Sequence, residues 1–240
     1  MTYEPWDAHD RNNLKTPVAI TFLQANPWLA PYDFSPSGGT PKLDLGCGAG
    51  PASALFAAAG TAVVAVDLTA IAARLTIAHS PGVVAQADAQ SLPFRDATFG
   101  RVFTWGVLHH TEDFEVAVGE VSRVLKADGA LLLMVYHRRS IRYYLKGLHR
   151  LIMKGDLFRG ETLATVQRFY TDGYFHRHFT VTELRQILGH HGFAIEAVDI
   201  THMNRPFAPW HWLDAAIKRR WGWLLVIRAR KRLAASSTWA

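Results

Sequence analysis

Short apolar runs rich in β-branched residues alternate with helix-like stretches between residues 42 and 136, and this alternation constrains the fold more than any other feature. In chain order the segments are KLDL, PASALFAAA, TAVVAV, TAIAARLTIAH, GVVAQA, RVFTW, DFEVAVGEVSRVLK and ALLLMVY. The runs at 62–66 and 130–136 are almost continuously apolar, as strands buried on both faces are. We therefore expect an α/β fold, with one mostly parallel sheet and helices on both faces.

The remaining sequence divides around this core. We expect an N-terminal helical cap at 1–41, a core at 42–136, an inserted lid at 137–179 and a C-terminal completion of the sheet at 180–240. Thr180 and Glu183 fit a capping box that begins a helix, which Gly192 ends. Strands are expected near 193–199 and 222–228.

Size and cysteine content exclude several classes of protein. The chain has 240 residues, of which 49% are hydrophobic, enough to fill a real core. Its single cysteine, Cys47, cannot form an intrachain disulfide or a multi-cysteine zinc site, so we expect a reducing, cytoplasmic location. The start MTYEPWDAHD lacks the basic and apolar parts of a signal peptide. The uncharged run 45–66 contains four glycines and a proline, which favours loop, helix and strand over a membrane span.

A glycine-rich loop follows the first expected strand. It reads Asp44-Leu-Gly46-Cys47-Gly48-Ala49-Gly50, and such a loop lets a ligand touch bare backbone. Its G-x-G-x-G spacing differs from the G-x-G-x-x-G of dinucleotide sites. The preceding carboxylate would repel a pyrophosphate but attract an ammonium group. The loop therefore favours a cofactor that carries an amino acid over NAD.

Two further acids are expected to end the next two strands. Asp67 ends the second strand, where a carboxylate can accept both hydroxyls of a ribose, and Asp88 ends the third, where it can accept the exocyclic amine of adenine beside the backbone of Ala89. Each acid alone could be a helix cap or turn residue. Carboxyl ends of parallel strands share one edge, so together with Asp44 these acids predict one binding crevice.

The core sequence resembles the class I S-adenosylmethionine-dependent methyltransferases, within the methyltransferase type 11 group that includes the ubiquinone and menaquinone C-methyltransferases. The matching stretches are LDLGCGAG, VVAVDLT, QADAQSLPF, DATFGRVFTWGVLHHTED and EVSRVLKADGALLLMVYHR. This resemblance implies a Rossmann-like sheet of seven strands, the last of which, GWLLVIRARK, is antiparallel, with the lid inserted after the fifth strand. It also implies S-adenosyl-L-methionine as cofactor and S-adenosyl-L-homocysteine as product.

The resemblance also assigns cofactor-binding residues by motif position. The glycine loop, with Asp44, Gly46, Cys47, Gly48 and Gly50, is expected at the methionine moiety. Asp67 is expected at the ribose, Leu68, Asp88 and Ala89 at the adenine, and Trp105 along the cofactor.

Histidines follow the fourth strand at its cofactor end. An oxygen or carbon acceptor usually has to lose a proton, and histidine is the first candidate for a general base. We expect His110 to act as base or to orient the acceptor, with Tyr3, His109, Tyr136 and His137 as further acceptor-binding candidates. Alternatively, one of the paired histidines caps the next helix and the other packs under the loop. An acceptor that is already ionised needs no base.

Two other histidine pairs lie in the second half of the chain. His176 and His178 would share one face of an extended segment, and His190 and His191 are adjacent. No carboxylate stands at a matching spacing, so we expect solvated or pocket-lining histidines and no metal site.

Charge is unevenly distributed along the chain. Residues 1–136 contain 8 Lys and Arg against 13 Asp and Glu, whereas residues 137–240 contain 18 against 7. Two interpretations of the basic segments 138–154 and 207–223 remain open. They form a lid whose apolar stripe (Ile141, Leu145, Leu148 and Ile152) packs on the sheet edge or lines the acceptor site, or they contact an anionic membrane. Interleaved long aliphatics and the lack of an RNA-binding motif argue against nucleic acid.

Together these observations predict a methyltransferase that acts on a small organic acceptor. The expected reaction is O- or C-methylation of a polyketide, aromatic, sugar or quinone-like metabolite, as in natural product biosynthesis. The alternatives are methylation of RNA or protein and, in another class, a regulatory protein that binds S-adenosylmethionine without turnover. No sequence feature fixes the oligomeric state.

Overall fold

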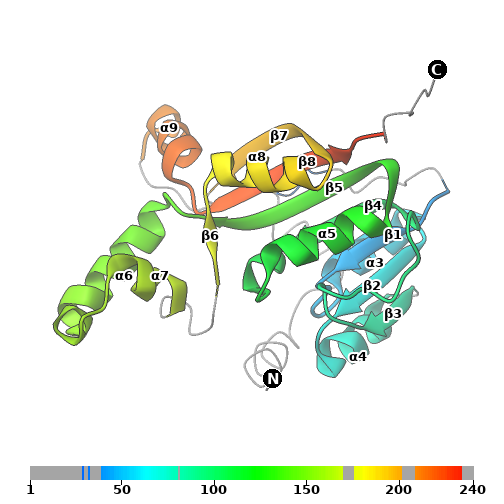
Figure 1. The fold of residues 1–240 in the computed structure, drawn as a ribbon, viewed down its shortest axis with the longest axis horizontal. Helices are drawn as coiled ribbons and strands as arrows, with labels where there is room; N and C mark the ends of the chain where they lie inside the picture. Colours follow the sequence, from blue (N-terminus) through cyan, green and yellow to red (C-terminus); the bar gives the residue numbers. More distant parts are fainter. Residues whose placement is uncertain are drawn as a thin grey trace.

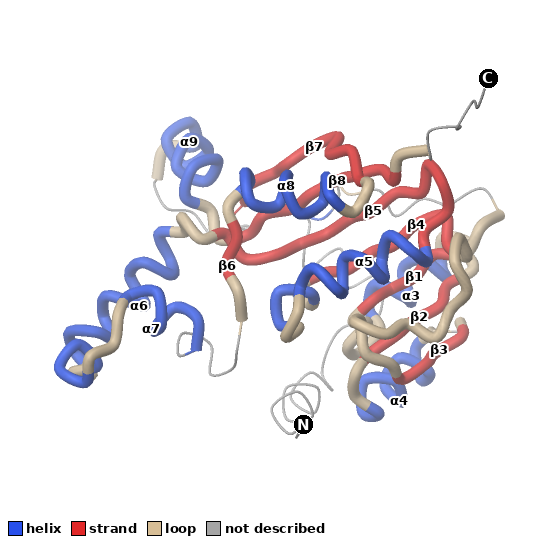
Figure 2. The backbone as a smooth tube through the Cα atoms, in the orientation of Figure 1, coloured by secondary structure: helices blue, strands red, loops and turns tan. Residues whose placement is uncertain are grey.

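The computed structural model of the chain describes residues 29, 32, 39–80, 82–169, 176–201 and 209–233. Within them, eight strands form one sheet (Figures 1 and 2). The strands are β1 (Lys42–Leu45), β2 (Val63–Asp67), β3 (Val83–Gln86), β4 (Phe99–Trp105), β5 (Leu125–His137), β6 (His178–Phe179), β7 (Phe193–Thr201) and β8 (Leu224–Lys231). The helices are α3 (Pro51–Ala58), α4 (Ala70–His79), η3 (Leu108–His110), α5 (Phe114–Val124), α6 (Ile141–Met153), η4 (Asp156–Arg159), α7 (Leu163–Phe169), α8 (Val181–His190) and α9 (His211–Trp221).

Seven strands run in the order β3-β2-β1-β4-β5-β8-β7. β8 pairs antiparallel with both β5 and β7, while β1 to β5 pair parallel with one another. The expected antiparallel last strand is therefore confirmed. The eighth strand, β6, was not expected: its two residues pair in parallel with Tyr136 and His137, because β5 continues beyond the end of β4.

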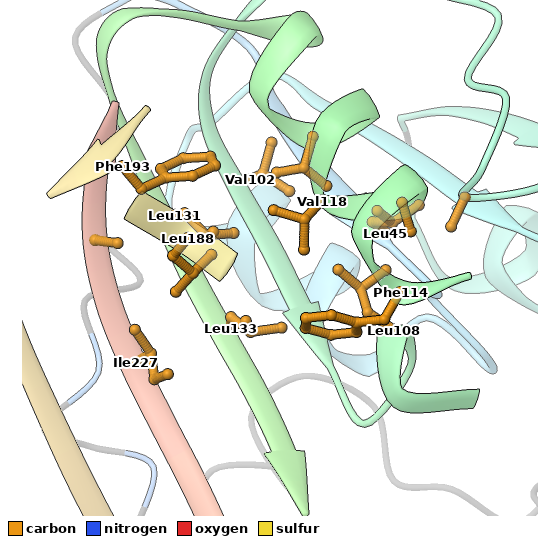
Figure 3. Close-up of a cluster of buried hydrophobic side chains, with 14 of the residues drawn as sticks. Leu45, Val102, Leu108, Phe114, Val118, Leu131, Leu133, Leu188, Phe193 and Ile227 are labelled. Atoms are coloured by element: carbon orange, nitrogen blue, oxygen red, sulfur yellow. The ribbon is translucent and has the colours of Figure 1, made fainter. Parts of the chain in front are cut away.

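Side chains alternate between the two faces of the sheet, as the two-residue period of a strand requires. Val102 of β4 joins the large core cluster that includes residues of α5 and α8, while the adjacent Phe103 packs with Phe56 of α3. Figure 3 shows the large cluster, in which Phe114 and Val118 of α5 point toward Leu133 of β5. Helices thus cover both faces, as the apolar strand runs predicted.

Local signals in the sequence account for several helix ends. Pro51 occupies the first turn of α3 directly after Gly50. At α8 the capping box of Thr180 and Glu183 is present, and Gly192, with φ of 81°, follows the C-cap. α5 is capped by Asp113, whose side chain accepts from two backbone amides, so neither of the preceding histidines caps it.

The segment after β5 lies beyond the end of the sheet. In Figure 1, α6 and α7 lie at one end of the molecule, far from β3 and α4. α6 buries Tyr143, Gly147 and Leu151, while Leu145, Leu148 and Ile152 of the predicted apolar stripe are exposed. This stripe therefore does not pack on the sheet edge. No helix in the described ranges is both long and apolar enough to cross a membrane.

Candidate active site

The glycine loop connects β1 to α3 at the carboxyl ends of the parallel strands. Gly46, Gly48 and Gly50 have φ angles of 79°, 54° and 83°, a region that favours glycine. A Cβ at Gly46 would lie 2.0 Å from Cγ2 of Val107, and one at Gly50 would lie 2.9 Å from Cα of Thr76. A Cβ at Gly48 would meet nothing within 4 Å. The outer glycines are therefore fixed by packing, whereas the middle one faces open space.

Asp44 lies under this loop, on the face of the sheet that α3 covers. Only 1% of its surface is exposed, and Oδ2 accepts a 2.5 Å hydrogen bond from Oγ of Ser53 in α3. Burial raises the pKa of Asp44 to about 7, the Ser53 hydrogen bond opposes that shift, and the nearby charge of Asp67 adds to it. This carboxyl group is poised to ionise more readily beside a positive charge.

Asp67 links the glycine loop to the end of β2. Its Oδ2 accepts from the backbone amide of Gly48 at 3.0 Å, and Oδ1 accepts from the amide of Thr69 at 3.0 Å. Oδ1 also accepts from Oγ1 of Thr69 at 3.3 Å. A carboxylate has about four acceptor positions, so these bonds orient the group and leave capacity for a further donor. Asp67 is only partly buried.

The third acid lies two residues beyond β3. Oδ1 of Asp88 accepts from the backbone amide of Gln90 at 2.8 Å, which holds the turn. Ala89 is buried in the core, and the carbonyl of Leu68 accepts from Nε2 of Gln86 at 2.9 Å. The structure thus places the three predicted acids at or just beyond the carboxyl ends of the parallel strands β1, β2 and β3, at one edge of the sheet.

The side chains of two other predicted cofactor residues, Cys47 and Trp105, contact other side chains of the protein. Cys47 is buried, and its Sγ accepts from Oγ1 of Thr76 at 3.3 Å; burial, then the charges of Asp44 and Asp67, raise the pKa of the thiol well above its usual range. Trp105, at the end of β4, packs against Phe103 and Tyr32 with ring centroids 5.8 and 5.6 Å apart. Cys47 therefore offers the loop exterior only its backbone.

The candidate acceptor residues gather around one tyrosine. The ring of Tyr136, near the end of β5, lies 4.0 Å from that of His109 and 5.8 Å from that of His110. Val107, which contacts Gly46, precedes this histidine pair, and its carbonyl accepts from the amide of His110. The cluster is therefore joined directly to the glycine loop.

The two histidines differ in environment. His109 is fully buried, and neither ring nitrogen has a hydrogen-bond partner among the described residues. Burial, assisted by the neighbouring His110, His176 and His178, lowers the pKa of His109 well below its usual value. His110 is only half-buried. His109 is thus held neutral, and His110 is the more accessible of the pair.

Further rings reach this cluster from the second half of the chain. His176 lies 5.5 Å from Tyr136 and 6.0 Å from His110, between ring centroids. Tyr143 of α6 lies 5.3 Å from Tyr136 and 4.2 Å from His178. The two-residue spacing of His176 and His178 predicted that they share one face of an extended segment. Nothing in the sequence pointed to Tyr143, because its contacts are long-range.

One predicted acceptor residue, His137, makes its hydrogen bond outside this cluster. Nδ1 of the buried His137 is 2.9 Å from the carbonyl oxygen of Gly222, which ties the end of β5 to the start of β8. Tyr3 lies outside the described residues. In the described ranges, no group of three or more His, Cys, Asp or Glu side chains could hold a metal ion.

Comparisons with known proteins agree on the domain type. Residues 43–133 match the family model described as a methyltransferase domain. An uncharacterised methyltransferase of Bacillus subtilis, YcgJ, is 36% identical over 101 residues, 40% of this chain and 40% of that protein. A demethylmenaquinone methyltransferase of Streptomyces avermitilis is 35% identical over 92 residues, 38% and 40% of the respective chains. The match with this chain thus covers about two fifths of the length of these curated relatives.

Solved structures share the fold over most of the chain. A protein solved in complex with the Haloferax volcanii Trm112 methyltransferase activator matches with a TM-score of 0.65 and 16% identity, over 96% of this chain and 98% of that one. A methyltransferase from Mesorhizobium loti matches with a TM-score of 0.62 and 20% identity, over 85% and 96% of the two chains. Residues 43–133 therefore form a methyltransferase domain within the class I fold, and the cofactor implied by that domain is S-adenosylmethionine.

Proposed function

We propose that this chain is an S-adenosylmethionine-dependent methyltransferase that methylates an oxygen or carbon of a small organic acceptor. The observation that carries the acceptor class is the cluster around Tyr136, where planar aromatic and imidazole rings gather beside the glycine loop. Such rings suit a planar organic molecule, whereas a polynucleotide would need cations there to meet its phosphates. The demethylmenaquinone relative, named for a quinone-type acceptor, supports the same choice.

The residues around the glycine loop fit the cofactor. The position beside Gly48 is a bare backbone cradle that a Cβ would occupy. Asp44 and Asp67 supply carboxylates for an ammonium group and for ribose hydroxyls, and Asp88 with the backbone at Leu68 and Ala89 suits an adenine. When bound, S-adenosylmethionine supplies a methyl group on a positively charged sulfur, which is reactive toward nucleophiles.

The protein then contributes alignment, exclusion of water and movement of a proton. An in-line displacement requires the acceptor atom to be held against the methyl group in a dry site. In this proposal Nδ1 or Nε2 of His110 takes the proton of the acceptor, while the neutral His109 and Tyr136 form the wall behind it. Residues 137–179 act as the lid that selects the acceptor, since they bring Tyr143 and His176 to the cluster.

Labelled methyl transfer tests the reaction. The protein is incubated with methyl-labelled S-adenosylmethionine and a fractionated lysate of the source cells, which is then partitioned into organic, RNA and protein phases. Label in the organic phase supports a small acceptor. Label in RNA or protein overturns that acceptor class, and no transfer with intact cofactor binding favours a regulatory protein.

Two substitutions separate cofactor binding from catalysis. Asp67→Ala is expected to weaken cofactor binding by about 1.5–3 kcal/mol, as lost hydrogen bonds to a charged group do. His110→Ala is expected to lower turnover while cofactor affinity, measured by calorimetry, stays near the wild-type value. A fully active His110→Ala variant contradicts the proposed base.

A further inference from the structure

Among the described residues, exposed large apolar side chains gather on α6 and η4. Seven large apolar side chains there are exposed, and we call them the α6–η4 surface: Tyr144, Leu145, Leu148, Ile152, Met153, Leu157 and Phe158. Leu145, Leu148 and Ile152 are 61%, 50% and 58% exposed and share one helix face by their spacing. Phe158 is 90% exposed. A group of exposed large apolar side chains on neighbouring elements is typical of an interaction site.

The turn that carries Leu157 and Phe158 is held in place from inside. Asp156 is 3% exposed and accepts hydrogen bonds from Nε of Arg150 at 2.7 Å and from a terminal nitrogen of Arg159 at 3.1 Å. Gly155 and Gly160 bracket the turn with φ of 70° and 78°. Because the buried acid anchors η4, the two apolar side chains beside it are presented outward by the fold.

The positive charge of residues 138–159 indicates which kind of partner this surface suits. Residues 138–159 contain seven Lys and Arg and one acid, Asp156, which pairs with Arg150 and Arg159. Arg138 pairs with Glu183 of α8, and the segment as a whole keeps an excess of positive charge. Along α6, Arg142, Lys146 and Arg150 follow one another at one-turn spacing beside the apolar stripe. Long basic side chains that flank an apolar stripe suit the boundary between acyl chains and anionic headgroups.

α9 adds aromatic side chains at the same end of the molecule (Figure 1). Trp210 and Trp212 are 61% and 70% exposed, and Lys218, Arg219 and Arg220 lie in its last turn. The guanidinium carbon of Arg142 in α6 lies 4.0 Å from the ring centroid of Trp223, so α6 contacts the short segment between α9 and β8. Tryptophan is enriched where apolar and aqueous surroundings meet.

We propose that the α6–η4 surface docks the protein onto a lipid bilayer that contains anionic phospholipids. Apolar side chains enter the interface while the surrounding Lys and Arg side chains meet the headgroups. A nucleic acid would leave the apolar stripe in water, and a neutral apolar partner would not account for the excess of positive charge in residues 138–159. Docking does not depend on the proposed methyl transfer, and it is measured without cofactor or acceptor.

Vesicle sedimentation tests this proposal. The full chain is mixed with phosphatidylcholine vesicles and with vesicles that also contain about one third phosphatidylglycerol. Binding is expected to the anionic vesicles and to fall with added salt. The double variant Leu148→Ser, Phe158→Ser should lose at least about tenfold in partitioning, and Lys154→Glu severalfold.

α4, at the other end of the molecule, provides matched controls. Ile77 is 61% exposed and Arg74 is also exposed, so Ile77→Ser and Arg74→Glu should leave vesicle binding unchanged. Unchanged thermal unfolding would show that the α6–η4 variants are folded. The proposal is overturned if binding is equal with and without phosphatidylglycerol, if the double variant binds like wild type, or if these substitutions dissociate a dimer while vesicles are not bound.

Discussion

The glycine loop and the α6–η4 surface are specified in opposite ways. In the loop, polar groups are satisfied inside the protein: Ser53 donates to Asp44, and Gly48 and Thr69 donate to Asp67. On the α6–η4 surface, large apolar groups such as Leu148 and Phe158 are left exposed. The first region is fixed by contacts within the fold, whereas the second has side chains whose presence the fold does not explain. Substitutions should therefore damage the two regions in different ways.

The largest effect is expected inside the glycine loop. Gly46→Ala places a Cβ against Val107 at a positive φ, and we expect a loss of about 3 kcal/mol or more in the free energy of unfolding. Gly48→Ala meets no neighbour and should cost about 1 kcal/mol, while its Cβ fills the space proposed for the cofactor.

Chemical denaturation and calorimetric titration with S-adenosylmethionine distinguish these two variants. The expected result is a destabilised Gly46→Ala protein, and a folded Gly48→Ala protein that binds the cofactor weakly. Equal cofactor affinity for Gly48→Ala and wild type would show that the open side of the loop is not the binding face.

The buried carboxyl of Asp44 should make cofactor binding depend on pH. Its pKa is raised to about 7 in the free protein, and a bound ammonium group lowers that pKa by favouring the charged form. Binding therefore releases a proton, and affinity should rise with pH up to about 7 and level off above it. With a bound-state pKa below that range, affinity should fall about thirtyfold from pH 8 to 5.5.

Calorimetry in buffers of different ionisation enthalpy measures the released proton. Asp44→Asn is the control, because it keeps the shape of the side chain and cannot titrate. A pH dependence that survives in Asp44→Asn would assign the proton to another group.

The parts of the site that the sequence predicted are those that depend on residues close together in the chain. The glycine loop, the three acids and the caps at Pro51 and Thr180 depend on neighbours along the chain or on strand ends, and the structure places them as expected. The pairing of β6 with β5 and the contact of Tyr143 with His178 join residues far apart in sequence. No local pattern encodes such contacts.

The stripe on α6 illustrates a different limit. Its spacing predicted an amphipathic helix, and α6 forms as expected. Periodicity identifies which residues share a face but does not say whether the core lies on that side. Here Tyr143, Gly147 and Leu151 face inward, because the ring of Tyr143 packs on His178.

A smaller pH effect is expected from His109. Burial keeps its pKa well below the usual value, so the unfolded chain takes up a proton as the pH falls and the folded protein does not. The contribution of neutral His109 to the free energy of unfolding is therefore largely present above about pH 6.5. It is lost as the pH falls, by about 1 kcal/mol between pH 6.5 and 5.5. His109→Phe keeps a ring at this position and should reduce that loss, as measured by urea denaturation across the same range. An unchanged profile would assign the acid sensitivity to another histidine, such as His137, whose pKa burial also lowers.

The smallest effect on stability is expected on the exposed face of α6. Leu148→Ser removes an apolar side chain that is half exposed, and the free energy of unfolding should change by no more than about 0.5 kcal/mol. Leu151→Ala, on the buried face of the same helix, should cost about 2 kcal/mol or more because it leaves a cavity. A large destabilisation by Leu148→Ser would mean that the stripe is packed within the chain, and the contrast with the glycine loop would fail. Near-neutral stability means that the Leu148 side chain is not needed for the fold and is free to serve the proposed docking.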